Sequence, residues 1–213
     1  MTHPARRRWF TALATAAAAM TAGVLLAPPA SATAPNIPHK STAQAELNAL
    51  TVAGEGSMSG YSREAFPHWN AVSGNCNVRE EVLKRDGIDV RVGSDCYPDS
   101  GRWYSPYDGV TVYSAADMDI DHVVPLAEAW RSGARNWSAS KRENFANDLS
   151  YPQLRASSAS SNRSKGDDDP TRWKPVSSYH CTYSKMWIRS KYHWGLTLQP
   201  AEKSALQSML NTC

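Results

Sequence analysis

The hydrophobic pattern of this chain changes its period along the sequence, and this change limits the folds that the chain can adopt. Apolar residues have helical spacing in residues 42–53 and 77–87. Between residues 88 and 124, apolar and polar residues alternate in short runs separated by Gly, Pro and Asp, which is typical of strands. Helical spacing then returns, with one short strand-like run at residues 153–157. The pattern therefore predicts a mixed α+β fold.

The N-terminal region, residues 1–32, has the composition of a secretion signal. A basic start with Arg6, Arg7 and Arg8 precedes an Ala-rich apolar run, and small residues follow up to an expected cleavage site after Ala32. The run is too short for a confident membrane span, and no later segment approaches one. We therefore expect a secreted, extracellular protein with no membrane segment in its mature form.

Removal of this signal changes the charge of the protein. The whole chain has 23 basic and 20 acidic residues, and the three arginines of the signal account for the whole excess. A near-neutral mature chain has no general attraction to nucleic acid, so any nucleic-acid site must depend on a local patch of charge.

Four cysteines in an exported chain predict disulfide bonds, and none of them forms a CxxC pair. Of the three pairings, we favour Cys76–Cys96 with Cys181–Cys213, because each closes a local loop. The mature length suits one domain. We expect a mobile leader, a short helix and a linker over residues 33–60, followed by that domain over residues 61–213.

The residues with the clearest chemistry lie in two segments. The first is DIDHVVPL, where Asp121 and His122 end a predicted strand before Pro125. The second is SNRSKGDDDP, at residues 161–170. A neutral histidine can take a proton from water, and a carboxylate can hold a divalent cation that polarises a phosphate. The two segments together predict hydrolysis of a phosphodiester.

Both segments resemble the signature of HNH, or ββα-metal, endonucleases. More narrowly, the chain resembles secreted bacterial proteins of this family that are related to the nuclease domain of a modification-dependent restriction enzyme. The resemblance implies a ββα-metal core with additional packed helices, in which a β-hairpin and a crossing helix hold the site. It implies that His122 is the general base and that Asp121 and Asn162 bind the metal. Mg²⁺ or Mn²⁺ suits this site best, ahead of Zn²⁺, because the site offers one histidine and oxygen ligands rather than several His or Cys.

The same region offers supporting residues. Arg163 and Lys165 flank the predicted helix and are candidates for binding the substrate phosphate. Either Gln153 or Asn147 is expected to orient the loop that holds the base, as amides near metal sites do. Asp167, the first of three consecutive acids, could add a ligand or hold the loop.

One geometric condition applies to this site. Adjacent residues of a regular strand point to opposite faces, so Asp121 and His122 reach one phosphate only if the strand ends or twists there. Another histidine, His68, has no supporting partner in the sequence. We predict a monomeric, metal-dependent nuclease that acts on DNA. Two alternatives stay open, namely a phosphodiesterase for RNA or small nucleotides and a non-catalytic secreted binding module on the same scaffold.

Overall fold

The computed structural model describes Met1 and residues 33–213, so the predicted signal at residues 1–32 lies almost wholly outside the described residues. The α-helices are α1 Lys40–Ala49, α2 Val78–Asp86, α3 Leu126–Arg131, α4 Ala139–Ala146, α5 Ala159–Lys165, α6 His180–Trp194 and α7 Pro200–Leu210. The strands are β1 Ala71–Ser73, β2 Cys76–Asn77, β3 Gly87–Val92, β4 Pro98–Tyr104, β5 Thr111–Val112, β6 Met118–His122 and β7 Leu154–Ser158. Short 3₁₀ turns lie at Arg63–Ala65, Ala115–Asp117, Ala134–Asn136 and Ser177–Tyr179.

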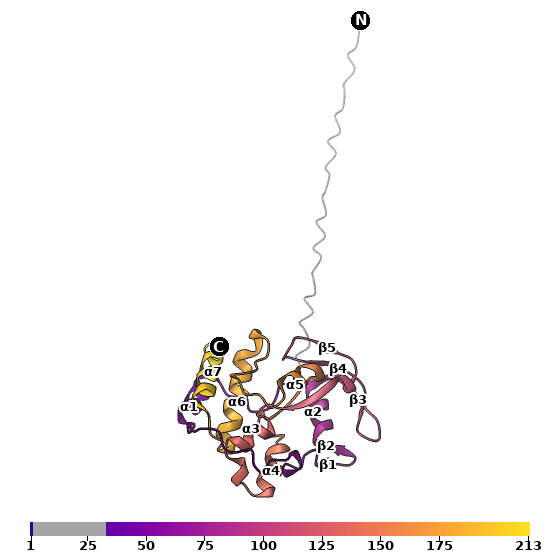
Figure 1. The fold of residues 1–213 in the computed structure, drawn as a ribbon. Coiled ribbons are helices and arrows are strands. Elements are labelled where there is room, and N and C mark those ends of the chain that lie inside the picture. The colour runs from indigo at the N-terminus through magenta and orange to yellow at the C-terminus, as the bar shows by residue number, and fades with distance from the viewer. Residues whose placement is uncertain (2–32) are drawn as a thin grey trace.

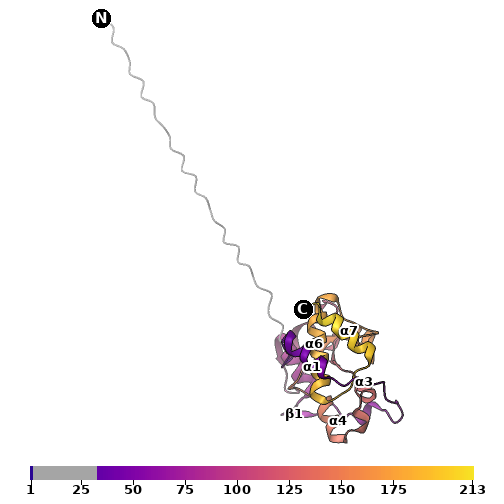
Figure 2. The same cartoon turned by 90° about the vertical axis from the view of Figure 1, so that its left-hand side faces the viewer.

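Three of the helices and the three-stranded sheet occupy different sides of the molecule. Figure 1 shows α1, α6 and α7 on one side and β3, β4 and β5 on the other, and Figure 2 shows the three helices side by side. The strands form small antiparallel sheets with the orders β1-β2, β3-β4-β5 and β6-β7. The predicted α+β class is therefore confirmed. Within the described part of the chain, every helix is too short or too polar to cross a bilayer.

The segment before residue 61 differs from the leader and linker that we expected. Ala34 is buried, and Ala43 and Leu47 of α1 have no exposed surface in the core formed with α6 and α7. Val52 forms a parallel bridge with Leu198, just before α7. The expected short helix is present as α1, and apolar residues between 34 and 50 pack into the same core as the helices that end the chain, whereas residues 54–60 are mostly exposed. The packing of the leader was not expected because polar residues surround these few apolar anchors in the sequence.

Both predicted disulfides are confirmed. Cys76 of β2 is bonded to Cys96 in the turn between β3 and β4, and Cys181 of α6 is bonded to Cys213 at the end of the chain. All four cysteines are paired. Each bridge closes a local loop, as the spacing suggested.

Two hydrophobic clusters meet at the end of β6. Met118 and Ile120 of this strand belong to a cluster formed with α2, β4 and β7. Val123 and Val124, directly after the strand, belong to the larger cluster formed by the helices. Asp121 and His122 lie between these two pairs, so the backbone on each side of them is anchored in a hydrophobic cluster.

The strands β6 and β7 and the helix α5 form a compact ββα unit. β6 pairs antiparallel with β7, and the pairing ends at His122 opposite Leu154. The two strands are not the simple hairpin that we expected, because α3 and α4 lie between them in the chain. β7 continues directly into α5, where the Ser158 side chain accepts a hydrogen bond from Ser161 N at 3.2 Å and caps the helix.

Helix α2 fastens this unit from the other side of β7. Asn77 caps α2, and the sequence pattern predicts both ends of this helix correctly. Asp86 at its C-terminal end accepts a hydrogen bond from Ala156 N at 2.8 Å and lies 3.1 Å from the guanidinium of Arg155. The backbone N–H of Ala156, on the edge of β7 that pairs with no strand, thereby has a hydrogen-bond partner inside the protein.

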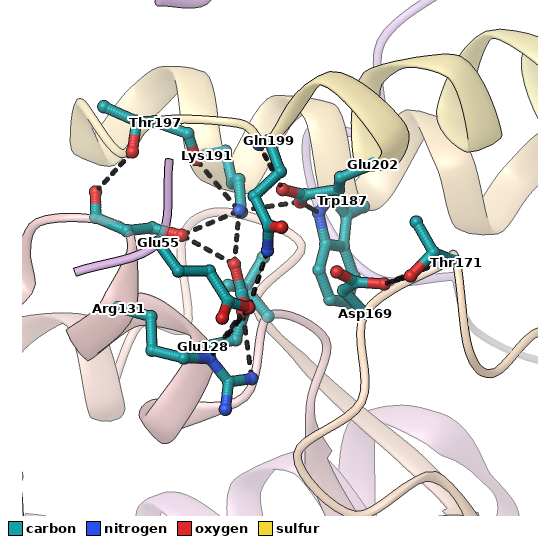
Figure 3. A network of polar contacts seen from close by, with 12 residues as sticks. Glu55, Glu128, Arg131, Asp169, Thr171, Trp187, Lys191, Thr197, Gln199 and Glu202 are labelled. Atoms are coloured by element: carbon teal, nitrogen blue, oxygen red, sulfur yellow. Dashed lines mark hydrogen bonds and ion pairs between the residues drawn. The ribbon is translucent and has the colours of Figure 1, made fainter. Parts of the chain in front are cut away.

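A buried ion network joins α3 to α6 and α7 (Figure 3). Lys191 Nζ lies 2.7 Å from Glu128 Oε1 and 2.6 Å from Glu202 Oε1, and all three side chains are inaccessible to solvent. It also donates to Ser132 Oγ and to the carbonyl of Thr197, both at 2.9 Å. Because α3 begins shortly after β6, this network fixes the chain that leaves the ββα unit.

Candidate active site

A pocket of about 190 Å³ opens beside the C-terminal end of β6. It is lined by Arg63, Ile120, Asp121, His122, Pro125, Asn162, Arg163, Gly166 and Asp167. Five residues that the sequence selected from two distant segments thus surround one cavity. Lys165, Gln153 and Asn147 lie outside its lining.

His122 is held as a neutral imidazole. Its side chain is buried, and Nε2 lies 2.9 Å from the carbonyl oxygen of Ala146 in α4. A carbonyl only accepts hydrogen bonds, so Nε2 carries the proton and Nδ1 has the free lone pair. Burial lowers the pKa of His122 to about 3. The ring is therefore uncharged near neutral pH and has one nitrogen able to accept a proton.

Two aromatic residues hold the ring of His122. The Trp69 ring centroid lies 5.6 Å from that of His122, and the His68 centroid lies 5.9 Å from it. His68 is itself fixed, because its Nδ1 donates to the carbonyl of Phe66 at 2.7 Å. The structure thus gives His68 the partners that the sequence did not suggest. Of these partners Phe66 is local, whereas His122 lies far away in the chain.

Asp121 is buried and bonded through both carboxylate oxygens. Tyr107 donates its hydroxyl to Oδ2 at 2.6 Å, and Lys165 Nζ lies 2.8 Å from Oδ1. Burial raises the pKa of Asp121 above its ordinary value, while Lys165 and Tyr107 oppose this rise. Each carboxylate oxygen has a second lone pair, so Asp121 can still bind a cation from the pocket side.

Lys165 does not lie where a phosphate could reach it. Its side chain has no exposed surface, and Nζ donates to Asp121 and to the carbonyl of His122, the latter at 3.0 Å. The expectation that Lys165 binds the substrate phosphate is therefore wrong in this structure. Arg163 keeps that candidacy: its side chain is 76% exposed, and Nε lies 3.7 Å from Asp119 Oδ2.

Asn162 lies in α5 with its amide directed at β6. Its Nδ2 donates to Asp119 Oδ2 at 3.1 Å, which leaves the amide oxygen as the atom that could bind a metal. Asp119 is two residues before Asp121 on the same strand, so both carboxylates leave β6 on one face.

The geometric condition set by the sequence is met because β6 ends at His122. Asp121 contacts α5 through Lys165, while His122 contacts α4 and Trp69. The two side chains have separate partners, yet both line the pocket at the last two positions of the strand.

The two amide candidates hold different segments. Gln153 is buried, and its Nε2 donates to the carbonyl of Val124 at 2.8 Å, so it fixes the backbone that follows His122. Asn147 instead holds the segment that precedes β1: its Oδ1 accepts from Asn70 N at 3.0 Å, and its Nδ2 donates to the carbonyl of Pro67 at 2.9 Å.

The residues of the pocket fit a hard divalent cation. Asp121 and Asn162 offer a carboxylate and an amide oxygen, which Mg²⁺ and Mn²⁺ prefer, and Asp119 lies beside them, bonded to Asn162. A separate group of carboxylates, from Glu55, Glu128 and Asp169, has oxygen atoms within 4.8 Å of one another. That group suits a metal less well, because Glu128 is already paired with Lys191 (Figure 3).

Sequence reasoning missed three residues of the site. Asp119 had a signal in its spacing, since alternate residues of a strand share a face. Tyr107 lies outside the two segments that carry the family resemblance, and its contact with Asp121 joins residues 14 positions apart. Arg63 lies in a short 3₁₀ turn with no periodic pattern, so no local signal could have identified it.

Comparison with known proteins assigns the chain to a family. Residues 91–209 match the family described as GmrSD restriction endonucleases, C-terminal domain. An uncharacterized secreted protein of Arthroderma benhamiae (strain ATCC MYA-4681 / CBS 112371) is 56% identical over 198 residues, which cover 92% of this chain and 97% of that protein. No solved structure gives a significant match. Because the family match spans more than half of the sequence, the chain belongs to the GmrSD restriction endonuclease C-terminal domain family.

Proposed function

We propose that this protein is a secreted, metal-dependent HNH endonuclease that hydrolyses phosphodiester bonds of DNA. One observation carries the proposal: a neutral His122, fixed by its bond to Ala146, lines the same pocket as Asp121 and Asn162. In this proposal β6, β7 and α5 are the ββα-metal core. Membership in a family named for restriction endonucleases supports the reaction class.

The side chains divide the reaction among them. His122 Nδ1 accepts a proton from water as the water oxygen attacks phosphorus, and the bond from phosphorus to the 3′ oxygen breaks. Asp121 and Asn162 hold the cation, and Arg163 lies at the rim where it can contact a phosphate oxygen. A bound Mg²⁺ or Mn²⁺ supplies charge stabilisation for the phosphate and the leaving oxygen. The products are a 5′-phosphate and a 3′-hydroxyl.

Secretion is supported by three independent observations. The N-terminal segment has the composition of a signal, the two disulfides suit an oxidising compartment, and the relative from Arthroderma benhamiae is named a secreted protein. The mature protein acts outside the cell as a monomer.

The test uses the mature chain, residues 33–213, on supercoiled plasmid DNA. We expect cleavage with Mg²⁺ or Mn²⁺ and none with EDTA. His122→Ala should lower the rate by about 10²- to 10⁴-fold, the usual contribution of a general base. His39→Ala is the matched control, because His39 is exposed before α1 and lies outside the pocket lining.

Three results would refute the proposal: no cleavage with Mg²⁺, Mn²⁺ or Zn²⁺, cleavage that persists in EDTA, or equal rates for the two histidine variants. Duplex DNA, RNA and a small phosphodiester should be compared at equal phosphate concentration. A preference for RNA or the small diester would replace DNA as the substrate while leaving the chemistry intact.

A further inference from the structure

We propose that Arg63 binds the phosphate of the nucleic acid that is cleaved, and that residues 61–70 form a substrate-binding wall added to the family domain. This inference rests on the proposed function and extends it to a segment outside the ββα unit. Residues 61–70 also precede the family match, which begins at residue 91.

Arg63 shares the pocket with the candidate catalytic residues. It lines the cavity together with His122 and Asn162, although it comes from the 3₁₀ turn Arg63–Ala65. Its side chain is exposed, and within residues 33–213 its guanidinium has no hydrogen bond or ion pair with a protein group. A guanidinium offers five donors in a planar fork that matches phosphate oxygens.

The burial of Lys165 makes Arg63 more important. The sequence suggested Arg163 and Lys165 as phosphate ligands, but Lys165 is enclosed against Asp121. The cationic side chains that line the pocket are Arg63 and Arg163, and Arg163 already has Asp119 as a neighbour at 3.7 Å. Arg63 is thus the lining cation whose donors are free for an anionic ligand within the described residues.

The segment that carries Arg63 is firmly attached. Phe66 has no exposed surface and packs edge-on against Trp130 and Phe145. Arg142 of α4 donates to the carbonyl of Ala65 at 2.9 Å, and Asn147 donates to the carbonyl of Pro67 at 2.9 Å. A wall fixed in this way loses little conformational freedom when it binds a ligand, which favours a binding role.

The same wall also holds the candidate base. Trp69 and His68 contact the ring of His122, so Arg63 and the supports of His122 belong to one short segment. Because phosphate contacts position a nucleic acid without reading its bases, Arg63 should contribute to binding on every sequence alike.

The experiment compares Arg63→Ala, Arg63→Lys and Arg91→Ala in the mature protein. Arg91 is an exposed arginine of β3 outside the pocket lining, so its variant removes the same charge elsewhere. We expect Arg63→Ala to lower kcat/KM on duplex DNA by about 10- to 100-fold, the range for a hydrogen bond to a charged group. Arg63→Lys should recover part of this loss, since it keeps the charge without the fork. Arg91→Ala should stay close to the parent protein.

A binding measurement separates this inference from the proposed function. A labelled DNA duplex is titrated against His122→Ala and against His122→Ala with Arg63→Ala, at several salt concentrations. The second change should weaken binding and reduce the slope of log K against log salt by about 1. Equal unfolding midpoints of the variants exclude a loss of fold.

The outcomes distinguish the two proposals. If Arg63→Ala matches Arg91→Ala in both assays while the parent protein cleaves DNA, Arg63 does not bind phosphate and the proposed function stands. If the parent protein cleaves nothing, the proposed function fails, and the binding slopes still decide whether Arg63 meets phosphate.

Discussion

Two lysines of this protein are completely buried against carboxylates, yet they lie in opposite kinds of surroundings. Lys191 lies between Glu128 and Glu202 and also donates to Ser132 and to the Thr197 carbonyl. Lys165 donates to Asp121 and to the carbonyl of His122, both of which adjoin an open pocket.

The difference separates a structural ion network from a functional one. Around Lys191 each charge meets an opposite charge or a hydrogen-bond partner inside the protein, so nothing there can respond to a ligand. Around Lys165 the carboxylate of Asp121 borders the pocket, so a second cation could share it. Burial and a short ion pair therefore do not by themselves show whether a lysine belongs to a structural network or to a functional site.

Removing Lys191 should give the largest effect on stability. Lys191→Met leaves the carboxylate of Glu202 buried without a cation and leaves Glu128 with Arg131 as its remaining cation, which we expect to cost about 3–5 kcal/mol in the free energy of unfolding. Urea unfolding measures this cost. Lys203→Met, on the partly exposed face of α7, is the control and should change little. A loss below about 1 kcal/mol for Lys191→Met would mean that water reaches the network.

Removing Lys165 should destabilise the protein less, and a metal should compensate. Lys165→Met in EDTA should cost about 3 kcal/mol, because Asp121 keeps the Tyr107 hydroxyl as a partner. Adding Mn²⁺ should raise the unfolding midpoint of Lys165→Met more than that of the parent protein, since the cation can replace the ammonium beside Asp121. The same addition should raise the midpoint of Lys191→Met only as much as it raises that of the parent protein, because Lys191 lies outside the pocket. Equal shifts in both variants would contradict the distinction between the two sites.

Acid should weaken the pocket region through His122. The folded protein has a His122 pKa of about 3, whereas an unfolded histidine has a pKa of about 6.5, so the unfolded chain binds more protons below that value. Stability is therefore lost as the pH falls below about 6.5, by about 2 kcal/mol between pH 7 and pH 5. Urea unfolding in EDTA at both values should show a smaller loss for His122→Gln. A loss of the same size in that variant would assign the effect to other groups.

Local chemistry explains which parts of the fold could be predicted. Asn77 at the start of α2, Ser138 at the start of α4 and Pro200 in the first turn of α7 act within a few residues, so the sequence indicates these helices well. The packing of α1 could not be predicted, because it depends on contacts with α6 and α7 at the other end of the chain.

The candidate site divides in the same way. Asp121, His122 and Asn162 could be selected because their spacing matches a family signature, and the structure brings them to one pocket. The direction of the Lys165 side chain could not be predicted, because it depends on how the short helix α5 crosses β6. The place of Arg63 was equally hidden, because it depends on packing between distant segments.

The two disulfides have a consequence for how this domain can be shortened. Each joins one cysteine inside residues 91–209 to one outside: Cys96 to Cys76, and Cys181 to Cys213. A fragment trimmed to the family boundaries would expose two unpaired thiols and would lose Arg63 with its wall. The covalent links thus tie the matched residues to a segment on each flank, so the smallest piece that keeps both bonds intact runs from Cys76 to Cys213.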